Sequence, residues 1–578
     1  MKWQEMETYA FLHFSLNTYT DQEWGYGNES PRLFNPSQLD VRQWVSVCKN
    51  AGMKGIILTA KHHCGFCLWP SDYTDYSVKS APWKDGRGDV VGELAAACKA
   101  AGLKFGVYLS PWDRHQASYG QPEYVTYFRH QLQELLTRYG DIFEVWFDGA
   151  NGGSGYYGGT DGNRQIDGHT YYQWAGTFSM IRRLQPTTVI WSDAGERADT
   201  RWVGTEAGYV GATNWSPFSK EGKASKGELH HGSENGSHWI PAEVNTSIRP
   251  GWFYHRCEDS KVKSVGKLIE TYYKSVGRNG TLLLNFPIMP NGLINEHDAH
   301  NSHAFFQAVR TAFSDNLAAT AKVSATNVRG RSKTYAARHA TDASADSYWA
   351  TDNGITHAAL TLAFPRPTTF NRFLVQEYIR LGQRVRAFSI EAFVNGRWQQ
   401  LKDALDEEGT GLTTIGYKRI VCFPTVTATR LRFTILDARA CPTISNIGVY
   451  LAPEITEPAL PAAPGQEEVS EKAAWVPVAT GSPLEMAYDM GATETLTGFS
   501  YLPPSETGNG LVTDYSFHVS PDGVTWTQVA RGEFANIVNN PIRQFVSFSA
   551  VRTRFIKLKA ERLAEGEKMA CRDLDILH

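Results

Sequence analysis

The first 317 residues alternate short apolar runs with stretches that show helical spacing. Eight of the apolar runs are typical of strands, and they cover residues 10–14, 55–60, 104–109, 144–148, 188–191, 202–206, 242–245 and 281–285. Between several of them, apolar residues recur at the period of a helix, at 41–51, 91–101, 123–139 and 171–184. The runs are nearly continuous, as in parallel strands that are covered on both faces. The pattern predicts an α/β fold in which eight strand–helix units close into a (β/α)8-type barrel.

The rest of the chain lacks helical spacing and shows short alternating stretches separated by turn residues, which is typical of β-sandwiches. Residues 453–466 contain four prolines and predict an extended linker. The pattern of residues 388–398 returns in diverged form at 515–526, so we expect two sandwiches of one type. The expected domains are a catalytic barrel at 1–317, β-sandwiches at 318–452 and 467–578, and the linker between them.

Charge and composition exclude several classes of protein. The chain has 57 Lys and Arg against 60 Asp and Glu, a net charge of −3, and so lacks the basic surplus that binding to nucleic acid requires. It contains no apolar run long enough to span a bilayer, which predicts no membrane insertion. The first residues lack the apolar core of a signal peptide. We therefore expect a cytoplasmic protein or the mature part of an exported one.

The cysteines do not indicate a disulfide scaffold, because there are eight in 578 residues. Cys64 and Cys67 form a CxxC pair, a spacing shared by redox pairs and by half-sites for zinc. No second CxxC occurs. We therefore favour the interpretation that both are small residues near a loop.

Nearly every predicted barrel strand ends in a polar or aromatic residue. A barrel places its active site at the carboxyl ends of its strands, so these residues are expected to share one site. They are His13, His62, His63, Tyr108, Asp148, Glu206 and Asn245.

Asp148 is the sharpest candidate, because an apolar strand ends abruptly in its carboxylate and a glycine follows. The alternatives are a helix N-cap and a loop salt bridge. A second carboxylate is expected among Asp193, Glu196, Asp199 and Glu206, and Glu206 is favoured because it ends the predicted strand 202–206. A pair of carboxylates across one pocket suits cleavage of a glycosidic bond.

The histidines allow two interpretations. His62 and His63 are adjacent and so point in different directions, which disfavours a shared metal, although a site with His13 as third ligand stays open. The alternative is that neutral imidazoles bind sugar hydroxyls. Glu23 and Trp24, in a polar loop after the first strand, suit the same pocket or a simple exposed loop.

Six segments, in order along the barrel region, resemble glycoside hydrolase family 29, the retaining α-L-fucosidases. They are residues 11–14, 60–66, 106–112, 146–149, 201–206 and 282–287. The resemblance implies an exo-acting enzyme with Asp148 as nucleophile, Glu206 as general acid/base and no cofactor for catalysis. It further implies fucose binding by His13, Glu23, Trp24, His62, His63, Tyr108, Trp146 and Trp252.

The segment 201–206 has the form found in the subfamily that acts on α-1,3- and α-1,4-linked branched fucose, which implies Lewis-type glycans or glycoconjugates as substrates. The loop 152–162 departs from the family pattern by its length. Because polysaccharide-handling enzymes usually work outside the cytoplasm, we expect an exported bacterial protein of the periplasm or extracellular space.

Residues 319–450 resemble the discoidin-like domain that is grouped with carbohydrate-binding module family 32. The matching segments are 340–342, 348–350 and 430–433. Acidic residues in its loops suggest a structural calcium at Asp342, with Asp346 and Asp352 as weaker ligands. The second copy lacks an equivalent of this segment.

Three function classes follow. The first is a retaining α-L-fucosidase, the second a carbohydrate-binding protein with an inactive barrel, and the third a His-dependent metallohydrolase. The paired carboxylates at Asp148 and Glu206 favour the first.

Overall fold

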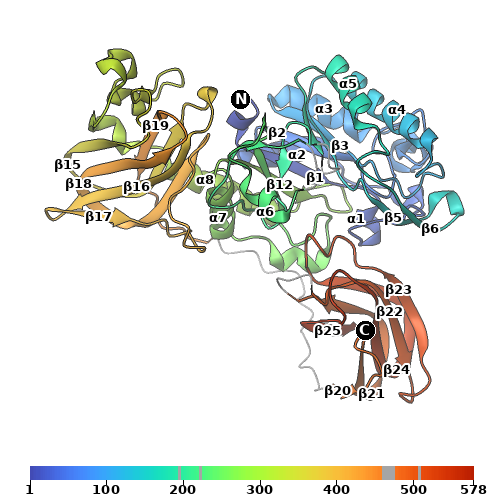
Figure 1. Ribbon diagram of the computed structural model, residues 1–578. Coiled ribbons are helices and arrows are strands. Elements are labelled where there is room, and N and C mark those ends of the chain that lie inside the picture. Colours follow the sequence, from blue (N-terminus) through green and yellow to red (C-terminus); the bar gives the residue numbers. More distant parts are fainter. Residues whose placement is uncertain (193–196, 221–223, 458–474, 505–508) are drawn as a thin grey trace. The chain divides into compact units, whose positions relative to one another are not determined.

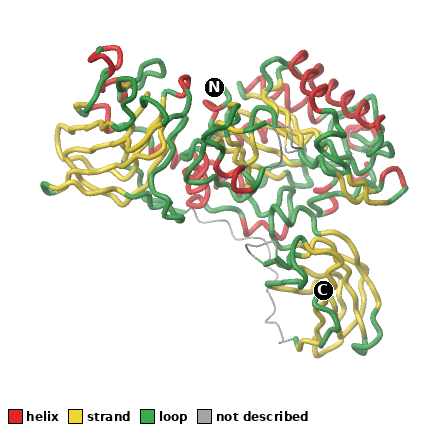
Figure 2. The backbone as a smooth tube through the Cα atoms, viewed as in Figure 1, coloured by secondary structure: helices red, strands yellow, loops and turns green. Residues whose placement is uncertain are grey.

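The computed structural model describes all 578 residues except 193–196, 221–223, 458–474 and 505–508 (Figure 1). Contacts divide the chain into two compact units. The first consists of Met1–Asp21 and Gly25–Pro461, and the second of Gln22–Trp24 and Ala462–His578. Figure 2 shows that helices and strands alternate in the N-terminal region, whereas strands dominate both later regions.

Eight parallel strands form the sheet of the N-terminal region. Hydrogen bonds join them in the order β7-β4-β3-β2-β1-β12-β11-β8, so the sheet curls into a nearly closed barrel, as predicted. In the described residues no ladder joins β7 to β8. The strands are β1 (Thr8–His13), β2 (Gly55–Lys61), β3 (Lys104–Leu109), β4 (Ile142–Phe147), β7 (Val189–Ser192), β8 (Arg201–Trp202), β11 (Ala242–Ser247) and β12 (Gly280–Pro287).

Helices follow most of these strands, and the four predicted helices are present. Local signals set their starts: Asp40 and Asp89 cap α2 and α3 by accepting backbone N–H bonds from Arg42 and Gly92. Only residues 193–200 separate β7 from β8. The helices are α1 (Asn17–Thr20), α2 (Val41–Asn50), α3 (Val90–Ala101), α4 (Pro122–Arg138), α5 (Trp174–Leu184), α6 (Lys226–His231), α7 (Val265–Ser275) and α8 (Glu296–Ala312).

Two short antiparallel strand pairs lie in the loops of the barrel region. β5 (Gly152–Gly155) pairs with β6 (Gly162–Gln165) in the glycine-rich segment after β4, and β9 (Pro217–Phe218) pairs with β10 (His238–Trp239) before β11. The loop 152–162, noted in the sequence for its length, is therefore mostly a hairpin.

Aromatic side chains fill the barrel interior. Phe11 on β1 packs edge-on against Tyr108, Trp146 and Trp252, with ring centroids 5.9, 4.9 and 6.3 Å away. Tyr9, two residues earlier on β1, belongs to the same buried cluster. The residues predicted for the site therefore stand on a packed aromatic floor rather than on an open channel.

The region after the barrel is an antiparallel sandwich, as predicted. Its strands run in the order β14-β19-β15-β18-β16-β17, and β13 pairs with β15. Register shifts within β15, between Ala363 and Thr368, break the long ladder with β18, which allows it to bend from one layer into the other. The strands are β13 (Lys322–Ala325), β14 (Trp349–Ala350), β15 (Ala358–Glu377), β16 (Val385–Val394), β17 (Arg397–Leu401), β18 (Arg419–Ala438) and β19 (Thr443–Tyr450).

The C-terminal region repeats this topology. Its order, β25-β21-β24-β22-β23, matches β19-β15-β18-β16-β17 strand for strand, with β20 pairing β21. The recurring segments of the sequence fall on equivalent strands, because residues 388–391 lie in β16 and 515–518 in β22. The strands are β20 (Val476–Val478), β21 (Glu485–Leu502), β22 (Val512–Ser520), β23 (Thr527–Glu533), β24 (Gln544–Leu563) and β25 (Asp573–Leu577).

Within the first unit, buried polar bonds join the barrel to the first sandwich. The Asn279 N–H donates to the Lys418 carbonyl at 2.9 Å, and the Ser216 N–H donates to Gln383 Oε1 at 2.8 Å. Asn279 immediately precedes β12, so this contact lies at the amino end of that strand, opposite the end where the candidate site residues stand.

Candidate active site

Asp148 lies one residue beyond the end of β4. The Tyr108 hydroxyl donates to its Oδ2 at 3.1 Å. Gly149 has φ of +78°, and a Cβ there would lie 2.3 Å from the His63 ring, so this turn requires glycine. No helix begins at Asp148, which removes the N-cap alternative, and the turn presents the carboxylate at the carboxyl edge of the barrel.

The three predicted histidines are buried side by side at this edge. The rings of His62 and His63 lie 4.1 Å apart, and His13 lies 5.9 Å from His62. His13 Nδ1 bonds with Asn285 Oδ1 at 2.8 Å, and His63 Nδ1 bonds with Ser110 Oγ at 2.7 Å. His62 Nδ1 has no hydrogen-bond partner among the described residues although it is buried. Such a nitrogen requires a partner, and a ligand hydroxyl is a suitable one.

Burial lowers the pKa of both His62 and His63 well below the ordinary value, and neighbouring positive or protonatable groups add to the effect. Both imidazoles are therefore neutral near pH 7. A neutral imidazole offers one donor and one acceptor nitrogen, which suits contact with hydroxyl groups.

Trp146 and Tyr108 continue the aromatic floor. The Trp146 ring stacks on Trp191 with centroids 3.6 Å apart and planes 4° apart. Its indole N–H donates to Glu243 Oε1 at 2.8 Å. The Tyr108 ring lies parallel to His62 at 5.6 Å. These contacts leave both aromatic rings fixed next to Asp148.

The strand that was predicted to end at Glu206 is shorter than expected. β8 covers only Arg201–Trp202, so the prediction of a strand over 202–206 is wrong, and Glu206 lies in the following loop. The cause is Gly204, whose φ of +80° is incompatible with an extended strand. Glu206 is half-buried, and its Oε2 accepts a 2.7 Å bond from the Trp252 indole. Trp252 therefore contacts the carboxylate as well as the aromatic floor.

Asp199 is the other predicted partner of Asp148 that lies among the described residues. Asp193 and Glu196 lie outside the described residues. Asp199 accepts the Ile190 N–H at 2.8 Å and pairs with Arg182, so it anchors β7 to α5. Glu23 and Trp24 belong to the second unit of the chain, and their roles stay predictions.

Asn285 is a residue whose role the sequence pattern did not single out. Besides its bond to His13, its Nδ2 donates to Ser247 Oγ and to the Trp252 carbonyl, both at 2.9 Å. It therefore joins β1, β11 and the Trp252 loop. Its position as the only amide in the apolar run of β12 was the available signal.

Asn245, on β11, was noted as a strand end but given no role. Its Oδ1 is buried without a partner among the described residues, as is the indole nitrogen of Trp191. Trp191 stacks on Trp146, and Asn245 follows Glu243, the acceptor of the Trp146 indole, by two residues on β11.

Comparison with known proteins identifies this arrangement. The α-L-fucosidase family model matches residues 1–304, which is more than half of the chain. The chain belongs to the α-L-fucosidase family. It is thus a glycoside hydrolase, and the inactive-barrel and metallohydrolase alternatives are set aside.

Individual relatives of this fucosidase agree with the family match. An α-L-fucosidase 1 from Arabidopsis thaliana is 42% identical over 460 residues, which cover 78% of this chain and 86% of that protein. A glycoside hydrolase 29 structure from an unknown rumen bacterium is 55% identical, covers 100% of this chain and 97% of its own, and has a TM-score of 0.72. A Ruminococcus gnavus GH29 fucosidase in complex with fucose is 30% identical, with coverages of 78% and 94% and a TM-score of 0.69.

The sandwiches of the fucosidase also match a known family. The F5/8 type C domain, which is the discoidin-like domain, matches residues 320–448 and again 458–573. This agrees with the matching strand orders of the two sheets. The domain boundaries predicted from the sequence stay predictions.

The described residues of the fucosidase contain no group of three or more His, Cys, Asp or Glu side chains arranged to hold a metal ion. The three acids predicted for calcium are engaged elsewhere. Asp342 accepts bonds from His339 and Ser347, Asp346 pairs with Arg380, and Asp352 accepts from Asn327.

The CxxC pair is buried in the barrel. Cys64 Sγ lies 3.4 Å from Ser15 Oγ, both thiols are free, and burial raises the pKa of Cys64 to about 12. Such thiols are poor nucleophiles at neutral pH.

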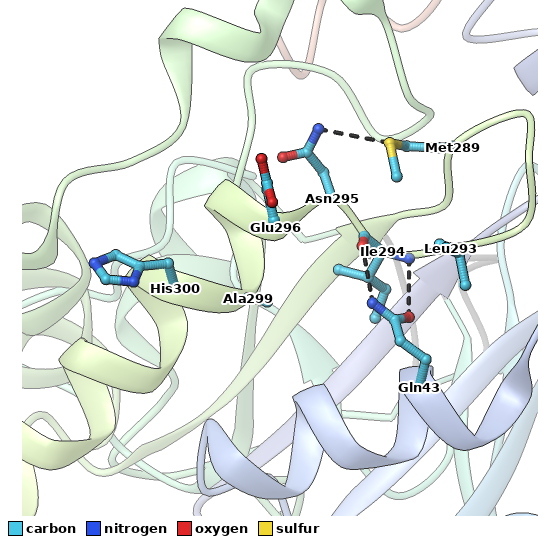
Figure 3. Close-up of a pocket in the computed structure, with 8 residues that line it drawn as sticks. All are labelled: Gln43, Met289, Leu293, Ile294, Asn295, Glu296, Ala299 and His300. Carbon is cyan, nitrogen blue, oxygen red and sulfur yellow. Dashed lines mark hydrogen bonds between the residues drawn. The ribbon is translucent and has the colours of Figure 1, made fainter. Parts of the chain in front are cut away.

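A separate cavity of about 630 Å³ lies between the amino ends of α2 and α8 (Figure 3). Gln43 bonds with the backbone of Ile294 at its base, and Glu296 and His300 line its α8 wall. None of the predicted site residues lines it.

In the described part of the chain, no helix is long and apolar enough to cross a membrane.

Proposed function

We propose that this enzyme is an exo-acting, retaining α-L-fucosidase that removes terminal fucose by double displacement, with Asp148 as nucleophile and Glu206 as general acid/base. The observation that carries the proposal is the pair of hydrogen-bonded carboxylates around one aromatic floor: Asp148 held by Tyr108, and Glu206 held by Trp252. Trp252 and Tyr108 both pack on Phe11, so the two carboxylates share one site.

The chemistry follows from these two groups. In the first step the Asp148 carboxylate attacks the anomeric carbon of fucose and its oxygen forms a glycosyl ester. The bond from that carbon to the leaving oxygen breaks as Glu206 donates its proton to that oxygen. In the second step the Glu206 carboxylate takes a proton from water, whose oxygen attacks the same carbon and releases Asp148. Two inversions give net retention.

The histidines and Trp146 are proposed to bind the sugar. The buried, unpartnered Nδ1 of His62 is available to a fucose hydroxyl. His13 and His63 each use Nδ1 for a protein bond, which fixes the orientation of both rings at the proposed sugar site. Flat rings such as Trp252 and Trp146 suit the apolar side of a deoxy sugar, which bears a methyl group. Glu23 and Trp24 are proposed to contact the same sugar.

The proposed substrates are branched glycans and glycoconjugates that carry α-1,3- or α-1,4-linked fucose. This proposal rests on the resemblance of the segment 201–206 to the subfamily that acts on such linkages. We further propose that the sandwiches bind or present such glycans and that the enzyme is exported to the periplasm or extracellular space. The described contacts of Asp342 do not support a structural calcium there. Rates on Lewis-type trisaccharides compared with a linear α-1,2-fucoside test the linkage preference.

The variant Glu206→Gln tests the acid/base assignment. It removes the proton donor, so turnover of natural fucosides, whose leaving groups need protonation, should fall at least about 1,000-fold. The first step on an aryl fucoside with an acidic phenol should change little, because that leaving group departs unaided. Steady-state and burst kinetics on both substrates measure the difference. Asp199→Asn is the control, because Asp199 is bound to Arg182 and Ile190 away from the site. Equal losses on both substrates would reject Glu206 as the acid.

A further inference from the structure

Two buried glutamates lie inside the barrel beneath the proposed site. Glu144 on β4 and Glu243 on β11 are both fully buried. Each accepts one indole N–H at 2.8 Å, Glu144 from Trp3 and Glu243 from Trp146. Their remaining oxygens, Glu144 Oε1 and Glu243 Oε2, are buried without a hydrogen-bond partner among the described residues. Neither forms an ion pair with a basic side chain in the described part of the chain.

Elementary chemistry favours one proton on this pair. An ionised carboxylate only accepts hydrogen bonds, and two carboxylates buried close together disfavour each other's charge. The pair therefore holds one proton and one negative charge. Burial, with repulsion from Glu243, raises the pKa of Glu144 well above its ordinary value, and burial raises that of Glu243 to about 7.

Tyr9 is the titratable group that faces the pair from β1. Its hydroxyl bonds with Thr281 Oγ1 on β12 at 3.1 Å. Burial, followed by the charges of Glu144 and Glu243, raises the pKa of its phenol. Tyr9 therefore stays neutral at working pH and can contribute a hydrogen bond but no charge.

The two glutamates lie on strands at either side of the β7–β8 junction, where the described residues form no strand ladder. β7 and β8 are the two ends of the hydrogen-bonded order, β4 is the neighbour of β7, and β11 is the neighbour of β8. The bond from the Trp146 indole to Glu243 thus connects β4 and β11, the strands that flank this junction. Trp191, on β7, stacks on Trp146, so β7 contacts the same indole ring.

The proposed catalytic carboxylates belong to these same flanks. Glu144, Trp146 and Asp148 follow one another at the two-residue period that places side chains on one face of a strand. Glu206 follows β8, which pairs with β11. Retention requires the two carboxyl groups to lie about 5–5.5 Å apart. The contacts that hold β4 against β11 therefore also maintain the distance between the two carboxyl groups.

We propose that Glu243, which shares one proton with Glu144 and accepts the Trp146 indole, is a positioning residue that fixes β4 against β11 and so sets the separation of Asp148 and Glu206. This inference rests on the proposed roles of those two carboxylates.

The test compares two variants of Glu243 with a matched control. Glu243→Met removes the acceptor of the Trp146 indole, so kcat should fall about 10- to 100-fold through misplacement, with KM within about threefold. Glu243→Gln keeps an acceptor oxygen for Trp146 and gives Glu144 an amide donor, so kcat should stay within about threefold of the wild type. Glu134→Met is the matched control. The buried carboxylate of Glu134, on α4, accepts the indole N–H of Trp69 at 2.8 Å, and the variant removes that bond. It should lower Tm and leave kcat unchanged.

A purely structural role predicts a different result, in which Glu243→Met lowers Tm and leaves kcat unchanged, as the control does. That result overturns the inference. If Glu243→Met does not fold, Trp146→Phe removes the same bond from the other side. Its kcat should fall by a similar factor, and adding Glu243→Gln should change it no more than twofold. Wild-type kcat in Trp146→Phe also overturns the inference.

Failure of the proposed function gives a separate signature. In that case Asp148→Asn retains turnover. Failure of this inference instead leaves Asp148→Asn inactive while Glu243→Met keeps full kcat, so the two outcomes are distinguishable.

Discussion

At the scale of single residues, each candidate catalytic carboxylate accepts a hydrogen bond from a neutral side chain. Tyr108 donates a phenol O–H to Asp148, and Trp252 donates an indole N–H to Glu206. A neighbouring Arg or Lys would stabilise the charged carboxylate and lower its basicity. A neutral donor fixes its direction at lower electrostatic cost to nucleophilicity, which suits the role of nucleophile proposed for Asp148.

The buried histidines predict a pH dependence of stability. The pKa of His62 and of His63 is lowered in the folded state by burial, so below pH 6.5 the unfolded chain binds two protons that the folded protein does not. The stabilisation is present above pH 6.5 and is lost as pH falls, by about 2.7 kcal/mol per pH unit for the two groups together. Denaturant unfolding between pH 7.5 and 5 measures the slope. In His62→Gln the slope should fall by about 1.4 kcal/mol per unit, and an unchanged slope would contradict a neutral buried His62.

Asp148 could be predicted from the sequence because a short range of residues determines its place: an apolar strand, a carboxylate and a glycine. Glu206 could not be placed as reliably, since one glycine, Gly204, turns the chain out of β8. Its partner Trp252 lies 46 residues later, and no local sequence pattern predicts that contact. The same limit applies to the bond between His13 and Asn285, which joins opposite ends of the barrel region.

At the scale of elements, the loop after β11 depends on one buried ion pair. Arg249 donates to both oxygens of Asp298 on α8, at 3.0 and 2.8 Å, and its Nη1 donates to Asp259 at 2.8 Å. Arg249 and Asp298 are fully buried. Because Trp252 follows Arg249 by three residues, this pair holds the segment that presents the indole to Glu206.

Replacing Arg249 by Met should therefore destabilise the enzyme by about 3–5 kcal/mol, because Asp298 is left buried and unpaired. Burial raises the pKa of Asp298, and Arg249 opposes that rise, so without Arg249 the folded pKa lies further above the unfolded value. The folded state then binds the extra proton, and the loss of stability should be smaller at pH 5 than at pH 8. Thermal unfolding at both pH values measures this. The exposed Arg310→Met is the control, and an equal loss at both pH values would contradict the argument.

Element boundaries were predicted well where burial alone sets them. The strand over 104–109 and the helix over 41–51 match β3 and α2 closely, since their apolar patterns are uninterrupted. The pattern did not reveal that β7 and β8 form no ladder in the described part of the barrel. Pairing between strands depends on partners that are distant in sequence, and β8 is too short for its pattern to specify one.

At the scale of the whole molecule, the first sandwich is bound to the barrel by buried polar groups. Arg419 on β18 is buried, donates to the Ala212 carbonyl at 2.6 Å and pairs with Asp403 at 3.3 Å. Such groups are costly to expose or leave unpaired. The barrel and this sandwich should therefore unfold together.

Arg419→Met tests this coupling. It leaves the buried Asp403 without its cation, so stability should fall by about 3–5 kcal/mol. Because Arg419 contacts the barrel away from the candidate site, kcat well below Tm should stay at the wild-type value. Calorimetry and aryl fucoside kinetics measure the two effects, with the exposed Arg397→Met as control. A large loss of kcat with unchanged Tm would contradict the argument.

The duplication of the sandwich was visible in the sequence because turn and strand signals recur in the same order. The topologies of the two sheets then agree strand for strand. The roles of Glu23 and Trp24 were not resolvable in the same way. A loop that carries no periodic pattern gives no information on which part of the molecule it contacts.

The most direct test of the account is to trap the covalent intermediate. A 2-fluorinated fucosyl donor with a good leaving group slows both steps, and the second more than the first when the leaving group is activated, so the glycosyl-enzyme accumulates. Mass spectrometry of the digested enzyme should then locate a single added sugar on Asp148, and Asp148→Asn should remain unlabelled. A label on another carboxylate, or no label together with an inverted product, would contradict the account.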